Sequence, residues 1–261
     1  MNYETLIYEE ADGIATVTMN RPEQMNAMNK RMNDELLNVL DRVEKDPGVK
    51  VVILTGGKKV FSAGSDIKEA STSEETQFEM YFRLRKKNEL FFRIENLEKP
   101  VIGAVSGIAL GGGFELNLVC DLIIASETAR FGLPEVKLGG LPAVGGTQRL
   151  PRIIGALKAK ELLFTGDFID AKEAYRLGLA NKVVPEDQLL EEANAFANKL
   201  INNPPLSIKF AKRAVNVGMQ LDLTSAIDYE AQCVALLMTS EDQTEGSMAF
   251  VEKRKPVFKG R

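Results

Sequence analysis

Apolar positions in the first half of the chain follow the patterns of β-strands. Residues 3–10 and 14–19 alternate between apolar and polar side chains, with the turn signal Asp12-Gly13 between them. Later come continuous apolar runs of the kind typical of fully buried strands. Each run leads into a loop that contains glycine, so we predict stacked β-β-α units with their loops presented on one side. The runs are VVILTGG (51–57), VIGAVSG (101–107) and LIIAS (122–126).

Helical patterns separate these runs and dominate the chain from about residue 144 onward. One helix is predicted from about Lys30 to Lys45 and a long polar helix over 74–97. Pro185 and Pro205 stand near the starts of two later helices, where proline is favoured. We therefore expect an α/β fold with a helix-rich C-terminal region. Its helices are predicted at 157–165, 171–178, 186–202, 205–218, 222–239 and 241–255.

Composition and charge exclude several classes of protein. The 261 residues are 44% hydrophobic and 27% charged, and their net charge is −4, whereas nucleic-acid-binding domains are usually basic. The acidic start MNYETLIYEE is unlike a secretion or transit signal, and no apolar run approaches the roughly 18–20 residues of a membrane span. Cys120 and Cys233 are far apart and are expected to be buried free thiols. We expect a cytoplasmic protein with no nucleic-acid or membrane partner.

The chain contains no histidine, which narrows the chemistry that it can perform. Ser-His and Cys-His nucleophile pairs, histidine metal sites and a histidine general base are all excluded. If the protein is an acid–base enzyme, carboxylates, lysines or tyrosines must move its protons.

The segment GIALGGGFE (107–115) places three consecutive glycines directly before Phe114 and Glu115. A glycine turn that opens a helix leaves backbone N–H groups without intrahelical partners, and these can bind an anion or a developing oxyanion. The spacing is not G-x-G-x-x-G, and no Lys-Ser or Lys-Thr follows, so the segment does not match the nucleotide-binding signatures. The alternative is a simple turn in which Glu115 only compensates the helix dipole.

Two further segments are candidates for the same site. In VFSAGSDIKEA (60–70) the small residues Ser62 to Ser65 let the backbone approach a ligand, but an ordinary turn with Asp66 as a helix cap explains them as well. In RFGLPEVKLGGLPAVGGTQRL (130–150) Glu135 lies in a glycine-rich loop, where a carboxylate alone is usually just solvated. Two glutamates in different surroundings, however, can divide the roles of acid and base.

Together these segments resemble the crotonase superfamily, and most closely its enoyl-CoA hydratases. FSAGSDIKE, GIALGGGFE and FGLPEVKLG…GGTQRL occur in order at matching intervals, and the likeness runs from VTMNRPEQMNAM to AFVEKRK. The resemblance implies a crotonase-like spiral of β-β-α units over 1–200 that carries the active site. It also implies a helical trimerisation or lid region over 201–261, and a homo-oligomer that is a trimer or a dimer of trimers (a hexamer).

The resemblance further implies a lyase reaction of fatty acid or other lipid metabolism. Such a hydratase adds water reversibly, with syn geometry, across the 2,3 double bond of a trans-2-enoyl-CoA to give a 3-hydroxyacyl-CoA. Coenzyme A is then part of the substrate, and no cofactor or metal is needed. Glu115 matches the glutamate that holds and activates water for attack on C3, and Glu135 the one that delivers a proton to C2. The backbone N–H groups of Ser65 and Gly112 match the oxyanion hole for the thioester oxygen.

Binding of the CoA thioester is implied for residues in three parts of the chain. Phe250 and Lys253 match a region that in relatives reaches a CoA site, often on a neighbouring subunit, although a solubilising tail is the alternative. Two positions depart from the family's pattern: Ser65 stands where alanine is common, and Glu23 where a basic residue is frequent, which puts a CoA contact from that loop in question. The implied substrate-binding residues are Ala63, Ser65, Asp66, Ile67, Lys68, Gly111, Gly112, Phe250 and Lys253.

Two other functions are left open by the sequence. A Δ3,Δ2-enoyl-CoA isomerase of the same superfamily can operate with one glutamate, so the pair Glu115 and Glu135 favours the hydratase. A non-catalytic CoA-binding or RNA-binding protein could keep the fold without this pair. The acyl chain is expected to run along a wall built from the 74–97 helix and the 140–145 loop, but its length and branching do not follow from the sequence.

Overall fold

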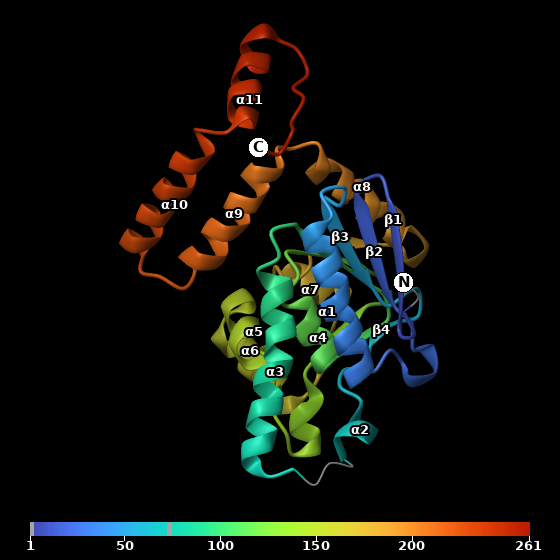
Figure 1. Ribbon diagram of the computed structural model, residues 1–261. Coiled ribbons are helices and arrows are strands. Elements are labelled where there is room, and N and C mark those ends of the chain that lie inside the picture. The colour runs from blue at the N-terminus through green and yellow to red at the C-terminus, as the bar shows by residue number, and fades with distance from the viewer. Residues whose placement is uncertain (1–2, 72–74) are drawn as a thin grey trace.

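Two sheets form the body of the molecule in the computed structural model, which describes residues 3–71 and 75–261 (Figure 1). Their strands are β1 (Leu6–Ala11), β2 (Ile14–Met19), β3 (Val51–Thr55), β4 (Val60–Ser62), β5 (Val101–Val105), β6 (Ile108–Leu110), β7 (Leu122–Ser126), β8 (Arg130–Gly132), β9 (Phe168–Asp170) and β10 (Lys182–Val184). The larger sheet has the strand order β1-β2-β3-β5-β7-β10 and the smaller one β4-β6-β8-β9. Neighbouring strands are parallel, except that β1 pairs with β2 and β8 with β9 in antiparallel fashion.

The chain alternates between the two sheets, and this alternation produces the predicted β-β-α units. β3, β5 and β7 lie side by side in the larger sheet, and each is followed by a short strand, β4, β6 or β8, of the smaller sheet. A helix follows each pair. Because equivalent strands of successive units are neighbours, the loops between units gather on one side, and the prediction of stacked β-β-α units is confirmed.

Helices cover both faces of the larger sheet. Ile53, Ile102 and Ile124 pack against Ala193 and Ala197 of one covering helix, α8, and the opposite face is part of the main hydrophobic core. The helices are α1 (Lys30–Lys45), α2 (Ile67–Ser71), α3 (Gln77–Glu95), α4 (Gly112–Asn117), α5 (Gly146–Ile154), α6 (Ala156–Thr165), α7 (Ala171–Arg176), α8 (Leu189–Ile201), α9 (Pro205–Gly218), α10 (Leu223–Leu237) and α11 (Glu241–Glu252), with 3-10 turns η1 (Pro22–Gln24), η2 (Pro134–Leu138) and η3 (Glu186–Gln188). Among the described residues, none of these helices has the length and apolar character that crossing a membrane requires.

Three features of the fold differ from the sequence prediction. The chain after residue 144 is not purely helical, because β9 and β10 complete the edges of the two sheets. The loop after β7 contains no glycine. The long polar helix begins at Gln77, where Thr76 and Glu79 form a reciprocal capping box, and residue 74, at which we predicted its start, lies outside the described residues.

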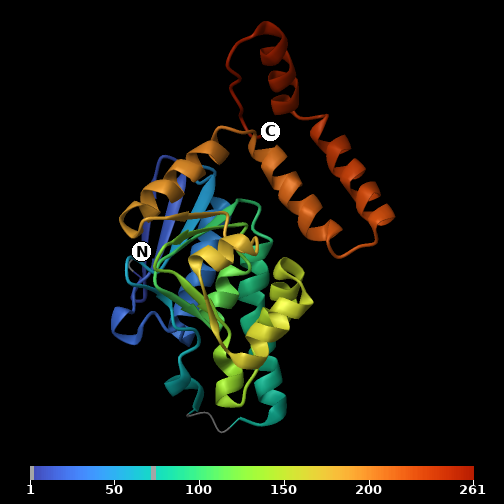
Figure 2. The same cartoon turned by 180° about the vertical axis from the view of Figure 1, so that it is seen from behind.

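The C-terminal helices α9, α10 and α11 extend away from the sheets, at the end of the molecule opposite α2 (Figures 1 and 2). Ion pairs dock α9 on the body: Lys212 Nζ lies 2.8 Å from Asp121 Oδ2, and Lys209 Nζ lies 2.6 Å from Glu98 Oε1. The proposed boundary between a core over 1–200 and a helical region over 201–261 stays a prediction.

Close packing of α4 on β4 generates a prediction about stability. A Cβ atom at Gly113 would lie 2.5 Å from the carbonyl oxygen of Ser62 and 2.7 Å from its Cβ. We expect Gly113→Ala to lower the free energy of unfolding by about 1–3 kcal/mol, because backbone must move to make room. Urea unfolding at a fixed protein concentration measures the change.

Gly246→Ala is the matched control, since the nearest atom, on Phe258, would lie 3.5 Å from the new Cβ within α11. This variant should be unchanged or more stable by up to about 1 kcal/mol, the helix propensity of alanine over glycine. Wild-type stability of Gly113→Ala would show that the close approach is not required.

Candidate active site

The loop after β4 and the beginning of α4 lie against each other, and two backbone amides meet there. A Cβ atom at Gly64, whose φ is +99°, would lie 2.7 Å from the carbonyl oxygen of Leu110 and 3.1 Å from the amide nitrogen of Gly112. A Cβ atom at Gly112 would in turn lie 3.5 Å from the amide nitrogen of Ser65. Within residues 3–71 and 75–261, neither the Ser65 nor the Gly112 N–H donates to an acceptor of the chain. Both donors are therefore available to a ligand.

The segment around Asn26 holds the Ser65 loop in place. The buried Nδ2 of Asn26 donates to the carbonyl oxygens of Gly56 and Val60, at 3.0 and 2.9 Å. The amide of Met28 donates to the carbonyl oxygen of Gly64 at 2.7 Å. The amide of Asp66 donates in turn to the carbonyl oxygen of Met28 at 3.1 Å. Because Gly64 and Asp66, the two neighbours of Ser65, are both bonded to Met28, the Ser65 amide is held in position.

Arg21 and Asp66 fasten the same loop electrostatically. Arg21 Nη1 donates to Asp66 Oδ2 at 3.0 Å. Burial alone would raise the pKa of Asp66, but the hydrogen bond from Arg21 and those from the backbone amides of Glu69 and Lys68 lower it. The Asp66 carboxylate therefore anchors the loop and the start of α2, and a contact between Asp66 and substrate stays a prediction.

Glu115 lies on α4 with its carboxyl group inside the protein, only 2% exposed. Its Oε1 accepts hydrogen bonds from the amides of Val144 and Gly146, at 2.9 and 2.7 Å. Burial raises the pKa of Glu115, while these two N–H donors and the charge of Lys87 act in the opposite direction. The donors hold one oxygen and favour the ionised form.

Glu135 lies on the 3-10 turn η2, which Pro134 begins, close enough to Glu115 for the charges of the two carboxyls to interact. A Cβ atom at Gly111 would lie 3.0 Å from its Oε1, so the carboxyl group rests on the glycines that open α4. Its Oε2 is buried and has no hydrogen-bond partner among the described residues. Burial first, and then the charge of Glu115, raise the pKa of Glu135 to about 7. A pKa of about 7 leaves Glu135 partly protonated at neutral pH, so this carboxyl can act as a proton donor.

Lys87 is a site residue that the sequence did not point to. It projects from α3, and its Nζ donates a hydrogen bond of 2.6 Å to Ser65 Oγ. Burial lowers the pKa of Lys87, and the charges of Glu115 and Glu135 oppose that change. Its helix is rich in polar residues, so one more lysine looked like part of a solvated surface. The overlooked signal is the spacing of Lys87 with Leu90, Phe91 and Ile94, the apolar residues of the inward face.

Some of the remaining predicted binding residues lie at this site, and others do not. Ala63 lies in the Ser65 loop and Gly111 directly under Glu135. Ile67 and Lys68 begin α2 and are exposed beside the loop. Phe250, which is 85% exposed, and Lys253 lie at α11, at the opposite end of the molecule from α2 (Figure 1). The chain does not bring these last two to its own Ser65 loop.

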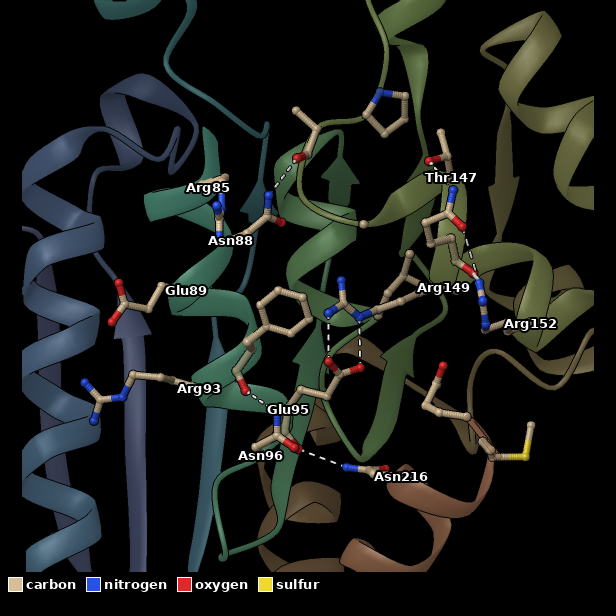
Figure 3. A pocket seen from close by; sticks show the side chains of 18 of the residues that line it. Arg85, Asn88, Glu89, Arg93, Glu95, Asn96, Thr147, Arg149, Arg152 and Asn216 are labelled. Carbon is tan, nitrogen blue, oxygen red and sulfur yellow. Dashed lines mark hydrogen bonds and ion pairs between the residues drawn. The ribbon is translucent and has the colours of Figure 1, made fainter. Parts of the chain in front are cut away.

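A groove lies adjacent to this site but separate from it (Figure 3). It has a volume of about 1620 Å³ and runs between α3, α5 and the end of α9. Arg149 and Glu95 form a two-fold ion pair within it, at 2.9 and 2.7 Å. Neither glutamate of the site lines the groove, whereas Ala143 and Gly145, from the loop that clamps Glu115, do. Asn88 Nδ2 donates to the Ala143 carbonyl oxygen at 3.3 Å and ties α3 to that loop.

The geometry suits addition or removal of a proton or water beside a carbonyl group. Two free amides can stabilise a developing oxyanion, and one ionised and one protonated carboxyl can act as base and acid. Among the described residues, no group of three or more Cys, Asp or Glu side chains is arranged to hold a metal ion.

The chain is similar in sequence and in fold to known proteins. A family model described as enoyl-CoA hydratase/isomerase matches residues 9–261. A short-chain-enoyl-CoA hydratase of Clostridium acetobutylicum is 46% identical over 98% of this chain and 97% of its own length. A crotonyl-CoA hydratase of Syntrophomonas wolfei is 44% identical over 99% of both. The crystal structure of an enoyl-CoA hydratase from Bacillus anthracis, 39% identical, superposes with a TM-score of 0.93 over 99% of this chain and 100% of that one.

The different surroundings of the two glutamates predict a titration that can be measured directly. In ¹³C NMR of glutamate-labelled protein, one side-chain carboxyl should titrate with a pKa of about 7, and its signal should be absent from Glu135→Gln. Because the charge of Glu115 raises this pKa and that of Lys87 lowers it, Glu115→Gln should move the titration to lower pH and Lys87→Met to higher pH. Titration of every resolved carboxyl near the ordinary value of 4.5 would contradict the assignment.

Proposed function

The chain belongs to the enoyl-CoA hydratase/isomerase family, and we infer that it is an enoyl-CoA hydratase in which Glu115 and Glu135 exchange protons with the substrate. It is a hydro-lyase that adds water across the 2,3 double bond of an enoyl-CoA thioester. One observation supports these catalytic roles above all. Two carboxyls with different hydrogen bonding, Glu115 and Glu135, lie beside two backbone amides that have no acceptor among the described residues.

The thioester oxygen is bound by the N–H groups of Ser65 and Gly112 in this proposal. Two donors withdraw electrons from the conjugated thioester, so C3 becomes electrophilic and the enolate-like transition state is stabilised. A single donor of this kind typically contributes about 3–4 kcal/mol to transition-state stabilisation. The proposal is supported by the neighbouring positions of these amides and by the bracing of the Ser65 loop through Asn26 and Met28.

Glu115 and Glu135 then divide the proton transfers. Ionised Glu115 accepts a proton from water as the water oxygen bonds to C3, and protonated Glu135 gives its proton to C2. After one hydration Glu115 carries a proton and Glu135 is ionised, and proton exchange with water restores the starting state. In the reverse dehydration Glu135 takes the proton from C2, and Glu115 protonates the leaving hydroxyl group. The division is supported by the two N–H donors on Glu115 Oε1 and by the raised pKa of Glu135, about 7.

An isomerase or a non-catalytic binding protein is less well supported by the same residues. Moving a double bond can be done with one carboxyl, whereas addition of water uses a base and an acid together. A binding protein has no use for a carboxyl such as Glu135, whose buried Oε2 has no partner among the described residues. Coenzyme A is the only coenzyme in this proposal, because the chain supplies both proton carriers and both oxyanion donors.

Oligomerisation and CoA binding are proposed on the position of α11. Phe250 and Val251 are 85% and 79% exposed on a helix remote from the chain's own Ser65 loop. We propose a cytoplasmic trimer, or a dimer of trimers, in which Phe250 and Lys253 reach the CoA moiety bound by a neighbouring subunit, while Lys68 meets its phosphates. A monomeric mass in solution would contradict this arrangement. The relatives named for short-chain and crotonyl-CoA substrates support a short acyl chain.

Glutamine variants test the assignment of Glu115 and Glu135. Each of Glu115→Gln and Glu135→Gln should reduce hydration of crotonyl-CoA by about 10²–10⁴-fold, because an amide neither accepts nor delivers the proton. The rate is followed as the loss of absorbance of the conjugated thioester. Calorimetry with butyryl-CoA, which lacks the double bond, should show nearly unchanged binding.

Glu127→Gln is the control, since Glu127 is exposed at the end of β7, and its turnover should equal that of the wild type. Near-normal turnover of either site variant would refute the role given to that residue. Absence of hydration by the wild type with all short enoyl-CoA thioesters, alongside intact binding, would refute the hydratase.

A further inference from the structure

Lys87 occupies a position at which the helix pattern calls for an apolar side chain. Residues 87, 90, 91 and 94 follow the i, i+3, i+4, i+7 spacing of one helical face, and Leu90, Phe91 and Ile94 are all buried. Arg85 and Lys86, the neighbouring cations, are exposed on other faces of α3. The half-buried Lys87 is thus a cation that α3 directs toward the Ser65 loop.

The ammonium group of Lys87 is only partly used by the protein. An ammonium carries three N–H donors, and Ser65 Oγ, at 2.6 Å, is the one acceptor recorded for it within residues 3–71 and 75–261. No carboxylate in that part of the chain forms an ion pair with it. Glu115 directs its Oε1 to the Val144 and Gly146 amides instead. Donors and charge are therefore left for a ligand.

A bound substrate would increase the free-energy cost of leaving the Lys87 ammonium group without a charged partner. Burial already removes part of the water around the ammonium group, and this desolvation lowers the pKa of Lys87. A thioester placed between Ser65 and the glutamates would remove more of its water. Burying a charge without a partner is unfavourable, and an apolar side chain of similar size would be better tolerated. A lysine at this position is useful if the substrate itself brings a negative charge.

The position of Lys87 matches the path of the acyl chain. The carbonyl carbon lies at the Ser65 and Gly112 amides, and C2 and C3 lie between the glutamates, so the chain beyond C3 leaves this space along its wall. Lys87 contacts Ser65 on that wall, and the next residue, Asn88, ties α3 to the loop at Ala143. A cation here, beside Ser65 and within electrostatic reach of both glutamates, borders the space through which a short acyl chain would pass.

From these observations we propose that Lys87 binds a carboxylate at the end of the acyl chain. The preferred substrates are then short 2-enoyl-CoA thioesters of dicarboxylic acids, and Ser65 Oγ holds the ammonium in position to receive them. Lys87 is thus a specificity-determining residue that pairs with substrate, beside the two glutamates that move protons. The proposal rests on the function inferred above for the same site.

Matched pairs of substrates test this inference. Each pair has the same number of carbons and differs in whether a methyl or a carboxylate ends the chain: pent-2-enoyl-CoA with glutaconyl-CoA, and hex-2-enoyl-CoA with 2,3-dehydroadipyl-CoA. In the wild type, kcat/KM should favour the carboxylated member by about tenfold or more, the value of one charge-assisted hydrogen bond. In Lys87→Met this ratio should fall by at least about tenfold, chiefly through KM of the carboxylated member. Lys86→Met, on an exposed face of the same helix, should keep the wild-type ratio.

Two results would overturn the proposal. The first is a wild-type enzyme that hydrates the methyl-ended members as well as the carboxylated ones. The second is an equal loss on both members in Lys87→Met, which would place the charge at the reacting atoms instead of the chain end.

Binding without turnover separates this proposal from the hydratase assignment. Glutaryl-CoA should bind more tightly than valeryl-CoA in calorimetry, and Lys87→Met should abolish the difference. If this preference is found while no enoyl-CoA is hydrated, the carboxylate subsite stands and the hydratase assignment fails. Equal binding of the two saturated thioesters by the wild type would refute the subsite whatever the turnover.

Discussion

The close approach of two backbone segments, residues 62–65 and 110–113, is the constraint on which the site depends. Side chains at Gly64 or Gly113 would collide with backbone atoms of the opposite segment, so only glycine permits this packing. The contact brings the amides of Ser65 and Gly112 together and begins α4 at that point. Glu115 then follows one helical turn later. The two amides of the proposed oxyanion site and the carboxyl proposed as the base are thus brought together by one packing contact between two β-β-α units.

Electrostatic differences within a small space give the two glutamates different roles. Burial raises the pKa of both, and what separates them is hydrogen bonding: Glu115 has two backbone donors, whereas Glu135 has a buried oxygen without a partner among the described residues. Each carboxyl also affects the other, because a charge on Glu115 makes ionisation of Glu135 less favourable. Lys87 adds a positive charge that the proton transfers themselves do not need. The site therefore combines a general acid–base device with a cation that distinguishes substrates.

The sequence predicted the elements that have strong periodicity and missed those that do not. The runs at 51–57, 101–107 and 122–126 were long and apolar enough to be recognised as buried strands. The strands β4, β6 and β8 have three residues each, too few for a pattern, and exist because they pair with one another. Helix α5 was missed because Pro151 lies inside it, where proline is usually a helix breaker.

Candidate site residues were predictable where a backbone motif accompanied them. Glu115 follows a glycine turn and Glu135 a proline, yet each had an ordinary structural explanation, and the family resemblance was needed to combine them. Lys87 has no motif, and its importance follows from the tertiary contact with Ser65, 22 residues earlier in the chain. Phe250 and Lys253 are a different case. They match a family motif for CoA binding, but α11, on which they lie, is far from the Ser65 loop of the same chain.

A crystal structure of the enzyme with bound 3-hydroxybutyryl-CoA tests the central claim most directly. The account predicts that the thioester oxygen accepts hydrogen bonds from the Ser65 and Gly112 amides, at about 2.7–3.1 Å. It also predicts that the 3-hydroxyl group contacts the Glu115 carboxylate, with the Glu135 carboxyl group beside C2. A thioester oxygen bound elsewhere, or a 3-hydroxyl group beyond hydrogen-bond distance of Glu115, would contradict it.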